Sequence, residues 1–194
     1  MVELSRAPNC KHPMNRKPLH RKHLLAALAL PVLLPTLAGA QDKTPAPNFI
    51  GKPTDWVNGA PQDLAKLKGK VVIVAVWTFE CINCQRTLKH WNNWARKYAG
   101  KDVVVVSIHT PELESERDPK AVEAYAKKNG LTFPVLIDND QKNWKAWSCR
   151  FWPSTGIVDK KGRIRGAWEG ELDWKGAGEY KRVEQLIERL RKEE

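Results

Sequence analysis

Two runs of β-branched residues, with a helical repeat between them, constrain the fold of this chain more than any other feature. Val71–Trp77 and Val103–Ile108 are short, almost continuous apolar segments, typical of strands that are buried on both faces. The segment between them repeats apolar residues at the spacing of one helix face: Leu88, Trp91, Ala95 and Tyr98. Strands joined through a helix pair in parallel, so this stretch predicts a strand–helix–strand unit.

The rest of the chain extends this pattern and closes it with a hairpin. Asp118–Pro119 predicts the start of a second helix, because an N-cap residue precedes proline at the first helical position, and Asn129–Gly130 predicts its end. We expect a third strand over Phe133–Ile137, a short helix over Trp144–Trp147, and a hairpin that turns at Asp159–Gly162. A closing helix is marked by Tyr180, Val183, Ile187 and Leu190. This order predicts an α/β fold with a mostly parallel sheet between helices and an antiparallel hairpin at one edge.

The first forty residues have the layout of a secretory signal peptide. Six Lys and Arg against one Glu give residues 1–40 a net charge of 6 − 1 = +5. The apolar run Leu24–Leu34 follows the basic residues, and Ala38–Ala40 forms an A-x-A cleavage site. Pro31 and Pro35 argue against a buried helix, and the short apolar run argues against a retained membrane anchor. We therefore expect export, to the periplasm or another extracytoplasmic site, or a membrane-anchored protein if the signal stays uncleaved.

The remaining residues have the size and charge of one domain. Translation starts either at Met1 or at Met14, and the sequence is compatible with both. Residues 41–48 are polar with two prolines and predict a linker, and residues 49–194 predict the domain. Without residues 1–40 the net charge is 11 − 5 = +6, and basic and acidic residues interleave, which argues against nucleic-acid binding. No stretch of about 20 apolar residues occurs, so a polytopic membrane protein is excluded. We expect a monomer.

Cys81 and Cys84 form a C-x-x-C motif where a predicted buried strand meets a predicted helix. A thiol at a helix N-terminus faces unpaired backbone N–H groups and the positive end of the helix dipole, which favour the reactive thiolate. Two intervening residues place the second sulfur one turn further along the helix, close enough to form a disulfide. We therefore predict that Cys81 is a nucleophile, that Cys84 is the resolving thiol, and that a redox-active Cys81–Cys84 disulfide joins them.

Three other uses of this pair remain open. A structural disulfide is one, although a bridge that closes so short a loop removes little entropy from the unfolded chain. Half of a zinc site is another, but a second C-x-x-C is missing and His90 and His109 are the nitrogen donors left. The third is copper binding through the two sulfurs, as in a thioredoxin-fold copper chaperone without turnover. We predict a redox enzyme without a metal site or a cofactor.

Several further motifs surround this pair in a fixed order. They are Trp77–Leu88, His109–Glu112, Asp138–Asp140 with Trp144, Trp152–Pro153, Gly162–Arg165 and Gly170–Glu171. With these motifs the chain, from about Asn48 to its end, resembles the thioredoxin superfamily. Within it, the chain is most similar to the TlpA/ResA-type exported thiol–disulfide oxidoreductases, near the DipZ-like branch with a redoxin domain.

The resemblance implies a thioredoxin-like fold, with a central mixed sheet and helices on both faces. It also implies that Pro153 is cis beside the active-site sulfurs and that the backbone of Trp152 pairs with substrate. The implied activity is dithiol–disulfide exchange with protein thiols, as a reductant fed by a membrane electron donor of the CcdA or DsbD type. Cytochrome c maturation or the repair of misoxidised proteins would be its task.

Some positions depart from the family pattern. The buried acid of thioredoxin would fall at Ala75 and that of ResA at Thr87, so neither acid is present. Glu80, His109 or water is then expected to exchange a proton with Cys84, and a carboxylate beside the dithiol would favour a reductant. His109 is expected either at the site's edge of the sheet or in a solvent-facing loop. Arg86 is a further candidate modulator.

Two alternatives concern the other cysteine and the reaction. Cys149 is expected to be a spare buried thiol, with a third redox group as the alternative. The spacing from Thr78 to Cys81 fits the T-x-x-C of peroxiredoxins, so a peroxidase is a rival function, although Val74 stands where their preceding proline should be.

Overall fold

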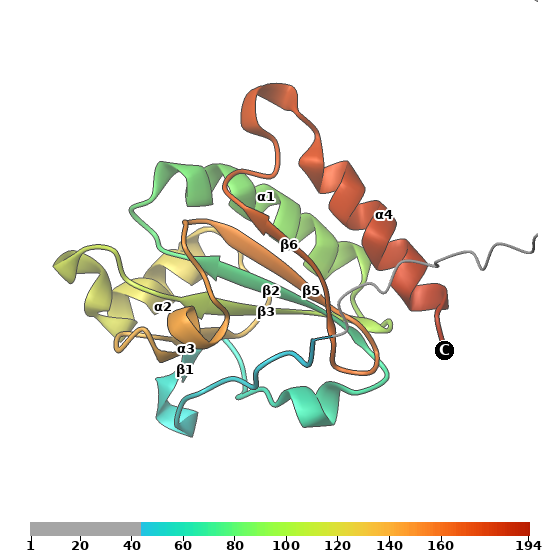
Figure 1. Ribbon diagram of the computed structural model, residues 1–194. Coiled ribbons are helices and arrows are strands. Elements are labelled where there is room, and N and C mark those ends of the chain that lie inside the picture. The colour runs from blue at the N-terminus through green and yellow to red at the C-terminus, as the bar shows by residue number, and fades with distance from the viewer. Residues whose placement is uncertain (1–43) are drawn as a thin grey trace, which may run out of the picture. The chain divides into compact units, whose positions relative to one another are not determined.

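A computed structural model of the protein describes residues 44–194 (Figure 1). The signal peptide predicted over residues 1–40 and the first residues of the predicted linker lie outside the described residues. The strands are β1 (Trp56–Val57), β2 (Val71–Trp77), β3 (Val103–His109), β4 (Val135–Ile137), β5 (Ser154–Val158) and β6 (Ile164–Glu169). The α-helices are α1 (Ile82–Lys97), α2 (Pro119–Lys128), α3 (Lys142–Ala146) and α4 (Glu179–Lys192). Short 3-10 turns are η1 (Pro53–Asp55), η2 (Leu64–Leu67), η3 (Glu114–Arg117) and η4 (Trp174–Gly176).

The six strands form one mixed sheet in the order β1-β4-β3-β2-β5-β6. The β2–β3 and β3–β4 pairs are parallel, whereas β2–β5, β5–β6 and β1–β4 are antiparallel. The prediction of an α/β fold with a mixed sheet is therefore confirmed, but the prediction of a mostly parallel sheet is wrong. The difference comes from β1, which adds an antiparallel edge. Two residues are too few to show the alternation that reveals a strand in a sequence.

The two faces of the sheet are covered unequally. Alternate residues of β2, such as Ile73 and Trp77, pack with α1, α2 and α4 in one apolar cluster. The residues between them, such as Val74, pack on the other face with side chains of α3, of η2 and of the segment before β1. Figure 1 shows α1 and α4 on one side of the sheet and the small α3 on the other. Helices thus lie on both faces, as the resemblance implied, and α1 carries the C-x-x-C motif against the more fully covered face.

Local signals place the helix ends where the sequence predicts them. Asp118 is the N-cap of α2, and its side chain accepts a hydrogen bond from the Lys120 N–H at 3.0 Å. Pro119 occupies the first turn, and Gly130, with φ at 63°, follows the end of the helix in the left-handed region. The predicted second helix is therefore confirmed.

The described part of the predicted linker is bound to the domain. The N–H of Ala46 donates to the Gly162 carbonyl, and the N–H of Ile164 donates to the Thr44 carbonyl, both at 2.9 Å. Pro45 forms an antiparallel bridge with Arg163, so this segment pairs with the β5–β6 hairpin. The backbone groups of Thr44–Ala46 therefore pair with the β5–β6 hairpin although this segment is polar and contains a proline.

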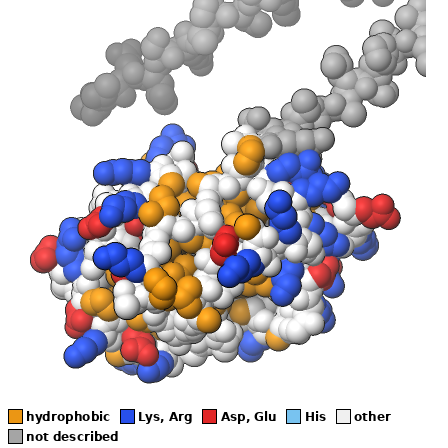
Figure 2. Space-filling model, turned by 90° about the horizontal axis from the view of Figure 1, so that it is seen from below, with side chains coloured by type: hydrophobic (Ala, Val, Ile, Leu, Met, Phe, Trp, Pro, Cys, Tyr) orange, Lys and Arg blue, Asp and Glu red, His pale blue; other side chains and the backbone are white. Residues whose placement is uncertain are grey.

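The surface of the described residues mixes charge types. Figure 2 shows a face on which apolar side chains gather at the centre, with Lys and Arg around them and fewer Asp and Glu between.

Within residues 44–194, no helix is both long enough and apolar enough to cross a bilayer.

Candidate active site

Cys81 lies at the point where β2 passes into α1 and is the N-cap residue of that helix. Its sulfur is partly buried and accepts a hydrogen bond from the Cys84 N–H at 3.4 Å. A hydrogen bond from the Cys84 side chain, and weaker ones from the backbone of Cys84 and Asn83, lower the pKa of Cys81 from 9.0 to about 7, while burial and the charge of Glu112 oppose this. Close to half of this thiol is therefore ionised at neutral pH.

Cys84 has the opposite environment. Its side chain is fully buried in the first turn of α1. Burial, followed by the hydrogen bond to Cys81, raises the pKa of Cys84 far above its ordinary value. Both cysteines are free thiols in this structure, so the disulfide between them remains a prediction. The pair combines one accessible, readily ionised sulfur with one protonated, inaccessible sulfur.

The Trp152–Pro153 peptide bond lies opposite Cys81 and is cis, as the resemblance implied. The sulfur of Cys81 is 3.9 Å from the Trp152 carbonyl oxygen. The indole of Trp152 stacks on Trp144 with ring centroids 4.0 Å apart, and its Nε1 donates to the Thr110 carbonyl at 2.9 Å. These contacts fix the loop before Pro153. The structure thus brings together Cys81, Cys84, Trp152 and Pro153, which lie far apart in the sequence.

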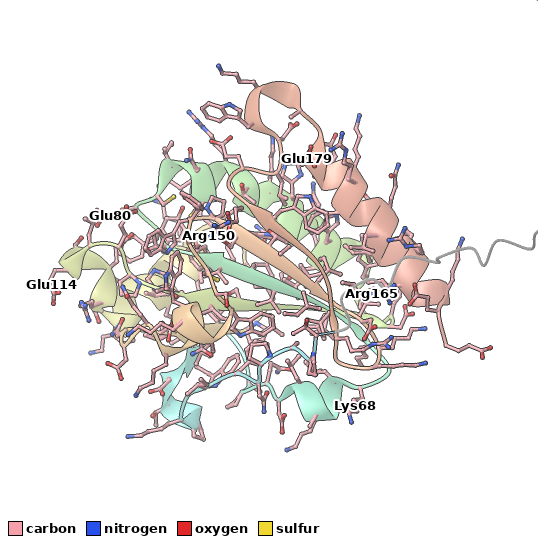
Figure 3. The ribbon with its side chains drawn as sticks, in the orientation of Figure 1. Lys68, Glu80, Glu114, Arg150, Arg165 and Glu179 are labelled. Atoms are coloured by element: carbon pink, nitrogen blue, oxygen red, sulfur yellow. The ribbon has the colours of Figure 1, made fainter. Side chains whose placement is uncertain are left out.

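Two of the predicted modulators lie at the surface. Glu80 is exposed, and its Oε1 accepts a hydrogen bond from the Ser115 hydroxyl at 2.8 Å. Glu80 and Glu114 come from the turn before α1 and the loop after β3, and they project from the same end of the molecule (Figure 3). Arg86 is also exposed and forms an ion pair with Glu171 at 3.0 Å. Neither side chain is buried against Cys84.

His109, the third predicted modulator, is completely buried at the end of β3, so the expectation of a solvent-facing loop is wrong. Its ring stacks on Phe79 and meets the edge of Trp77, with centroids 5.5 and 5.1 Å away. Nε2 lies 3.2 Å from Oγ1 of Thr78. Burial lowers the pKa of His109 from 6.5 to about 4, so this imidazole is neutral at pH 7.

Glu116 is a buried acid that sequence reasoning missed. Its carboxylate has no exposed surface and accepts hydrogen bonds from three backbone N–H groups, those of Glu80, Glu112 and Leu113, at 2.9, 2.7 and 2.8 Å. Burial alone would raise the pKa of Glu116, but the hydrogen bonds from Thr78 and from the backbone outweigh it and lower the pKa. The one signal in the sequence is its place three residues after Leu113, where a glutamate caps the turn η3.

Cys149 lies on the opposite face of the sheet from the dithiol pair. It packs with Val74 and Trp147, whereas Cys81 and Cys84 belong to the cluster under α1. Burial, reinforced by the charges of Asp138 and Glu169, raises the pKa of Cys149 to about 12. This environment favours the spare thiol over a third redox group.

Between residues 44 and 194, no three or more His, Cys, Asp or Glu side chains come together in a group that could hold a metal ion.

Comparison with known proteins agrees with this geometry. A family model described as AhpC/TSA matches residues 43–167. Protein DipZ of Mycobacterium tuberculosis is 34% identical over 148 residues, which are 75% of this chain and 20% of DipZ. The chain therefore spans about a fifth of the length of that relative. The thiol-disulfide oxidoreductase ResA of Bacillus subtilis is 26% identical over 144 residues, 73% of this chain and 76% of ResA.

The fold itself is also known from solved structures. A thioredoxin-like protein in its oxidised form superimposes with a TM-score of 0.65 at 26% identity, covering 76% of this chain and 95% of that protein. The thioredoxin-like fold that the resemblance implied is therefore confirmed.

Proposed function

The chain belongs to the AhpC/TSA family, and from this premise we propose that it is a thiol–disulfide oxidoreductase that exchanges a Cys81–Cys84 dithiol with protein disulfides. The observation that carries the proposal is the asymmetry of the two thiols. Cys81 is accessible with a pKa of about 7, whereas Cys84 is buried and protonated one turn further into α1. Exchange needs one thiolate that attacks the substrate disulfide and a second thiol that then attacks the resulting mixed disulfide.

The reaction follows from these positions. The Cys81 thiolate attacks one sulfur of a substrate disulfide, forming a mixed disulfide and releasing the other substrate sulfur, which takes up a proton. Cys84 then loses its proton and attacks Cys81, so the Cys81–Cys84 bond forms and the mixed disulfide breaks. The second substrate sulfur leaves and is protonated. The substrate gains two electrons and two protons, and the enzyme dithiol becomes a disulfide.

Exposed apolar side chains near Cys81 support a protein substrate. Ile82 follows Cys81 directly and is 55% exposed, Phe151 precedes Trp152 and is 56% exposed, and Leu113, in the loop after β3, is 50% exposed. Large apolar side chains left in water beside a reactive group favour contact with another protein chain. The Trp152 carbonyl, 3.9 Å from the Cys81 sulfur, is the group that we expect to accept a substrate backbone N–H.

The pKa of Cys81 supports the reducing direction. Oxidants such as DsbA hold their thiolate at a pKa of about 3.5, whereas thioredoxin has about 7, the value found for Cys81. A less stabilised thiolate is a poorer leaving group, and its disulfide is harder to reduce. We propose that the protein is an exported, monomeric reductant, supplied by a membrane donor of the CcdA or DsbD type. Cytochrome c maturation and disulfide repair are the tasks that fit this direction.

Trapping of mixed disulfides tests the exchange reaction. Cys84→Ser should accumulate covalent complexes through Cys81 that dithiothreitol releases, because the resolving thiol is missing. Cys81→Ser should give none, and Cys149→Ser should behave like the unmodified protein, which makes it the matched control. An absence of complexes with Cys84→Ser, under conditions where a known thioredoxin-like protein traps partners, would refute the proposal.

A redox titration tests the direction of electron flow. Alkylation of Cys81 and Cys84 after equilibration with dithiothreitol or glutathione should give a two-electron transition near about −270 mV or below for a reductant. A transition near about −120 mV would instead indicate an oxidant of secreted proteins.

A thiol peroxidase is the second candidate, because the family match and the Thr78–Cys81 spacing both favour it. In the structure, however, Oγ1 of Thr78 lies 3.2 Å from Nε2 of the buried His109. Stoichiometric consumption of hydrogen peroxide by the reduced protein, lost in Cys81→Ser, would support the peroxidase. Exchange with protein disulfides in the absence of peroxide consumption would exclude it.

A further inference from the structure

A buried carboxylate lies at the edge of the sheet where α1 begins, and the exchange reaction described above does not use it. It belongs to Asp138, which directly follows β4 and is 3% exposed. The N–H of Asp138 donates to the His109 carbonyl at 2.9 Å, and the N–H of Thr110, directly after β3, donates to the Trp77 carbonyl at 3.0 Å. The carboxyl ends of the parallel strands β2, β3 and β4 thus bring Asp138 and Thr110 together.

The Asp138 carboxylate accepts hydrogen bonds from α3 and from Thr110. Oδ1 accepts the backbone N–H of Asn143 at 2.9 Å and the side-chain amide of the same residue at 3.1 Å. Oδ2 accepts the N–H of Trp144 at 2.9 Å and the Thr110 hydroxyl at 3.0 Å. Gln141, the N-cap residue of α3, makes no side-chain cap hydrogen bond among the described residues. Asp138 therefore caps α3 from outside the helix and ties its first turn to Thr110.

Both groups that Asp138 holds are in contact with Trp152. The indole of Trp144 stacks on that of Trp152 with ring centroids 4.0 Å apart, and the Thr110 carbonyl accepts a hydrogen bond from Nε1 of Trp152 at 2.9 Å. The carbonyl oxygen of Trp152 lies 3.9 Å from the Cys81 sulfur. Asp138 is therefore connected, through Trp144 and through Thr110, to the backbone group that we expect to pair with substrate.

We propose that Asp138 is a positioning residue of the substrate-binding loop, which holds Trp144 and Thr110 so that Trp152 presents its backbone to a substrate chain beside Cys81. This inference rests on the proposed exchange reaction and deepens it. Asp138 acts on the contacts of the substrate chain rather than on the thiols. Its loss should therefore slow exchange with a protein, which pairs with this loop, and spare a reagent too small to do so.

Two reactions of Asp138→Asn, in a Cys149→Ser background, test the proposal. Asparagine offers one acceptor oxygen in place of two, so a backbone N–H of α3 loses its partner whichever way the amide faces. The kcat/KM for reduction of insulin should fall about tenfold or more, the worth of one hydrogen bond to a charged group. Alkylation of Cys81 by iodoacetamide should keep its rate and its pH midpoint, because this reagent has no backbone to pair with the loop.

Two control variants separate positioning from general effects. Asp140→Asn makes the same chemical change in the same loop, at a side chain that is 71% exposed, and should leave both reactions unchanged. Ile187→Val removes a buried methylene from α4 and controls for lost stability, so it should also leave both reactions unchanged. Insulin reduction by Asp138→Asn at the rate of Asp140→Asn, or an equal loss in the insulin and iodoacetamide reactions, would overturn the proposal.

Thr110→Val covers the case in which Asp138→Asn does not fold. Valine has nearly the shape of threonine, removes the hydroxyl that donates to Asp138, and keeps the carbonyl that accepts from Trp152. Insulin reduction should fall about threefold, since one neutral donor is lost, and alkylation should again be unchanged. Undiminished insulin reduction by this variant, with native circular dichroism, would overturn the proposal.

The indole N–H signal of Trp152 in 1H–15N spectra gives a readout that does not depend on turnover. The signal is assigned by its loss in Trp152→Phe. In Asp138→Asn it should shift and exchange faster with solvent, because the bond to the Thr110 carbonyl is weakened, and in Asp140→Asn it should not. An unchanged signal in Asp138→Asn would refute the inference. Failure of the unmodified protein to reduce insulin would count against the proposed function alone, and this signal would then decide the role of Asp138.

Discussion

Replacement of Cys84 by alanine tests the electrostatics of the site directly, because the Cys84 side chain makes the largest contribution to the low pKa of Cys81. That pKa falls from 9.0 to about 7, and the backbone N–H groups of Cys84 and Asn83 contribute less. Alanine keeps both backbone groups but removes the side-chain donor. Since burial and the charge of Glu112 still oppose ionisation, we expect the pKa of Cys81 in Cys84→Ala to return close to 9.

The size of the effect follows from two opposing terms. At pH 7 a thiol with a pKa of about 7 is half ionised, whereas one with a pKa of 9 is about 1% ionised, a roughly fiftyfold loss. The more basic thiolate is also a better nucleophile. With a Brønsted slope of about 0.4–0.5, a rise of two pKa units increases the rate constant of the thiolate about six- to tenfold. Cys84→Ala should therefore react about five- to eightfold more slowly at pH 7, yet about six- to tenfold faster at pH 10, where the thiol is almost fully ionised.

The assay is stopped-flow exchange with a small aromatic disulfide between pH 5 and 10, in a Cys149→Ser background. Cys84→Ser is the matched reference, because its hydroxyl still donates to the Cys81 sulfur and Cys81 is again the reacting thiol. We expect a midpoint near 7 for the serine variant and near 9 for the alanine variant, with rate curves that cross. Equal midpoints, or curves that never cross, would show that the Cys84 side chain does not control Cys81.

Three further predictions concern stability. The pKa of His109 is about 4 in the folded protein against 6.5 when unperturbed, so the unfolded chain binds more protons between these values. Stability should fall as the pH drops from 6.5 to 4, by up to about 1.4 kcal/mol per pH unit, and His109→Gln should flatten this slope in urea unfolding. Trp91→Phe should lower the free energy of unfolding by about 2 kcal/mol, because Trp91 is fully buried and its indole donates to the Thr155 hydroxyl at 3.2 Å. An unchanged midpoint of urea unfolding would contradict this packing. Asp118→Ala should lower the free energy of unfolding by about 1 kcal/mol, because it removes the side-chain acceptor for the Lys120 N–H at the start of α2. Asp118→Asn keeps an acceptor oxygen and should lower it less.

Most elements of the fold were predictable because their signals are local. The buried strands Val71–Trp77 and Val103–His109 carry continuous β-branched runs, and α2 carries its own start and stop residues. The strand β1 was not predictable, since Trp56–Val57 is held by its pairing with β4 rather than by a pattern of its own. The pairing of Pro45 with Arg163 was hidden for the same reason.

The chain sequence by itself determined the pair of thiols and their unequal roles. Cys81 and Cys84 lie within one helical turn, so a motif of four residues specifies which sulfur caps α1 and which points inward. The low pKa of Cys81 follows first from this local contact with Cys84, whereas the high pKa of Cys84 comes first from its burial in the folded core.

Only the tertiary structure decided which of the two glutamates near the motif is buried. Glu80 and Glu116 are both glutamates in charged stretches, and composition assigns both to the surface. Glu116 is buried because the backbone N–H groups of Glu80, Glu112 and Leu113 converge on its carboxylate, and they converge because β2 and β3 end side by side in the sheet. A buried charge is stable only where such donors meet, and segments distant in the sequence meet only in the folded chain.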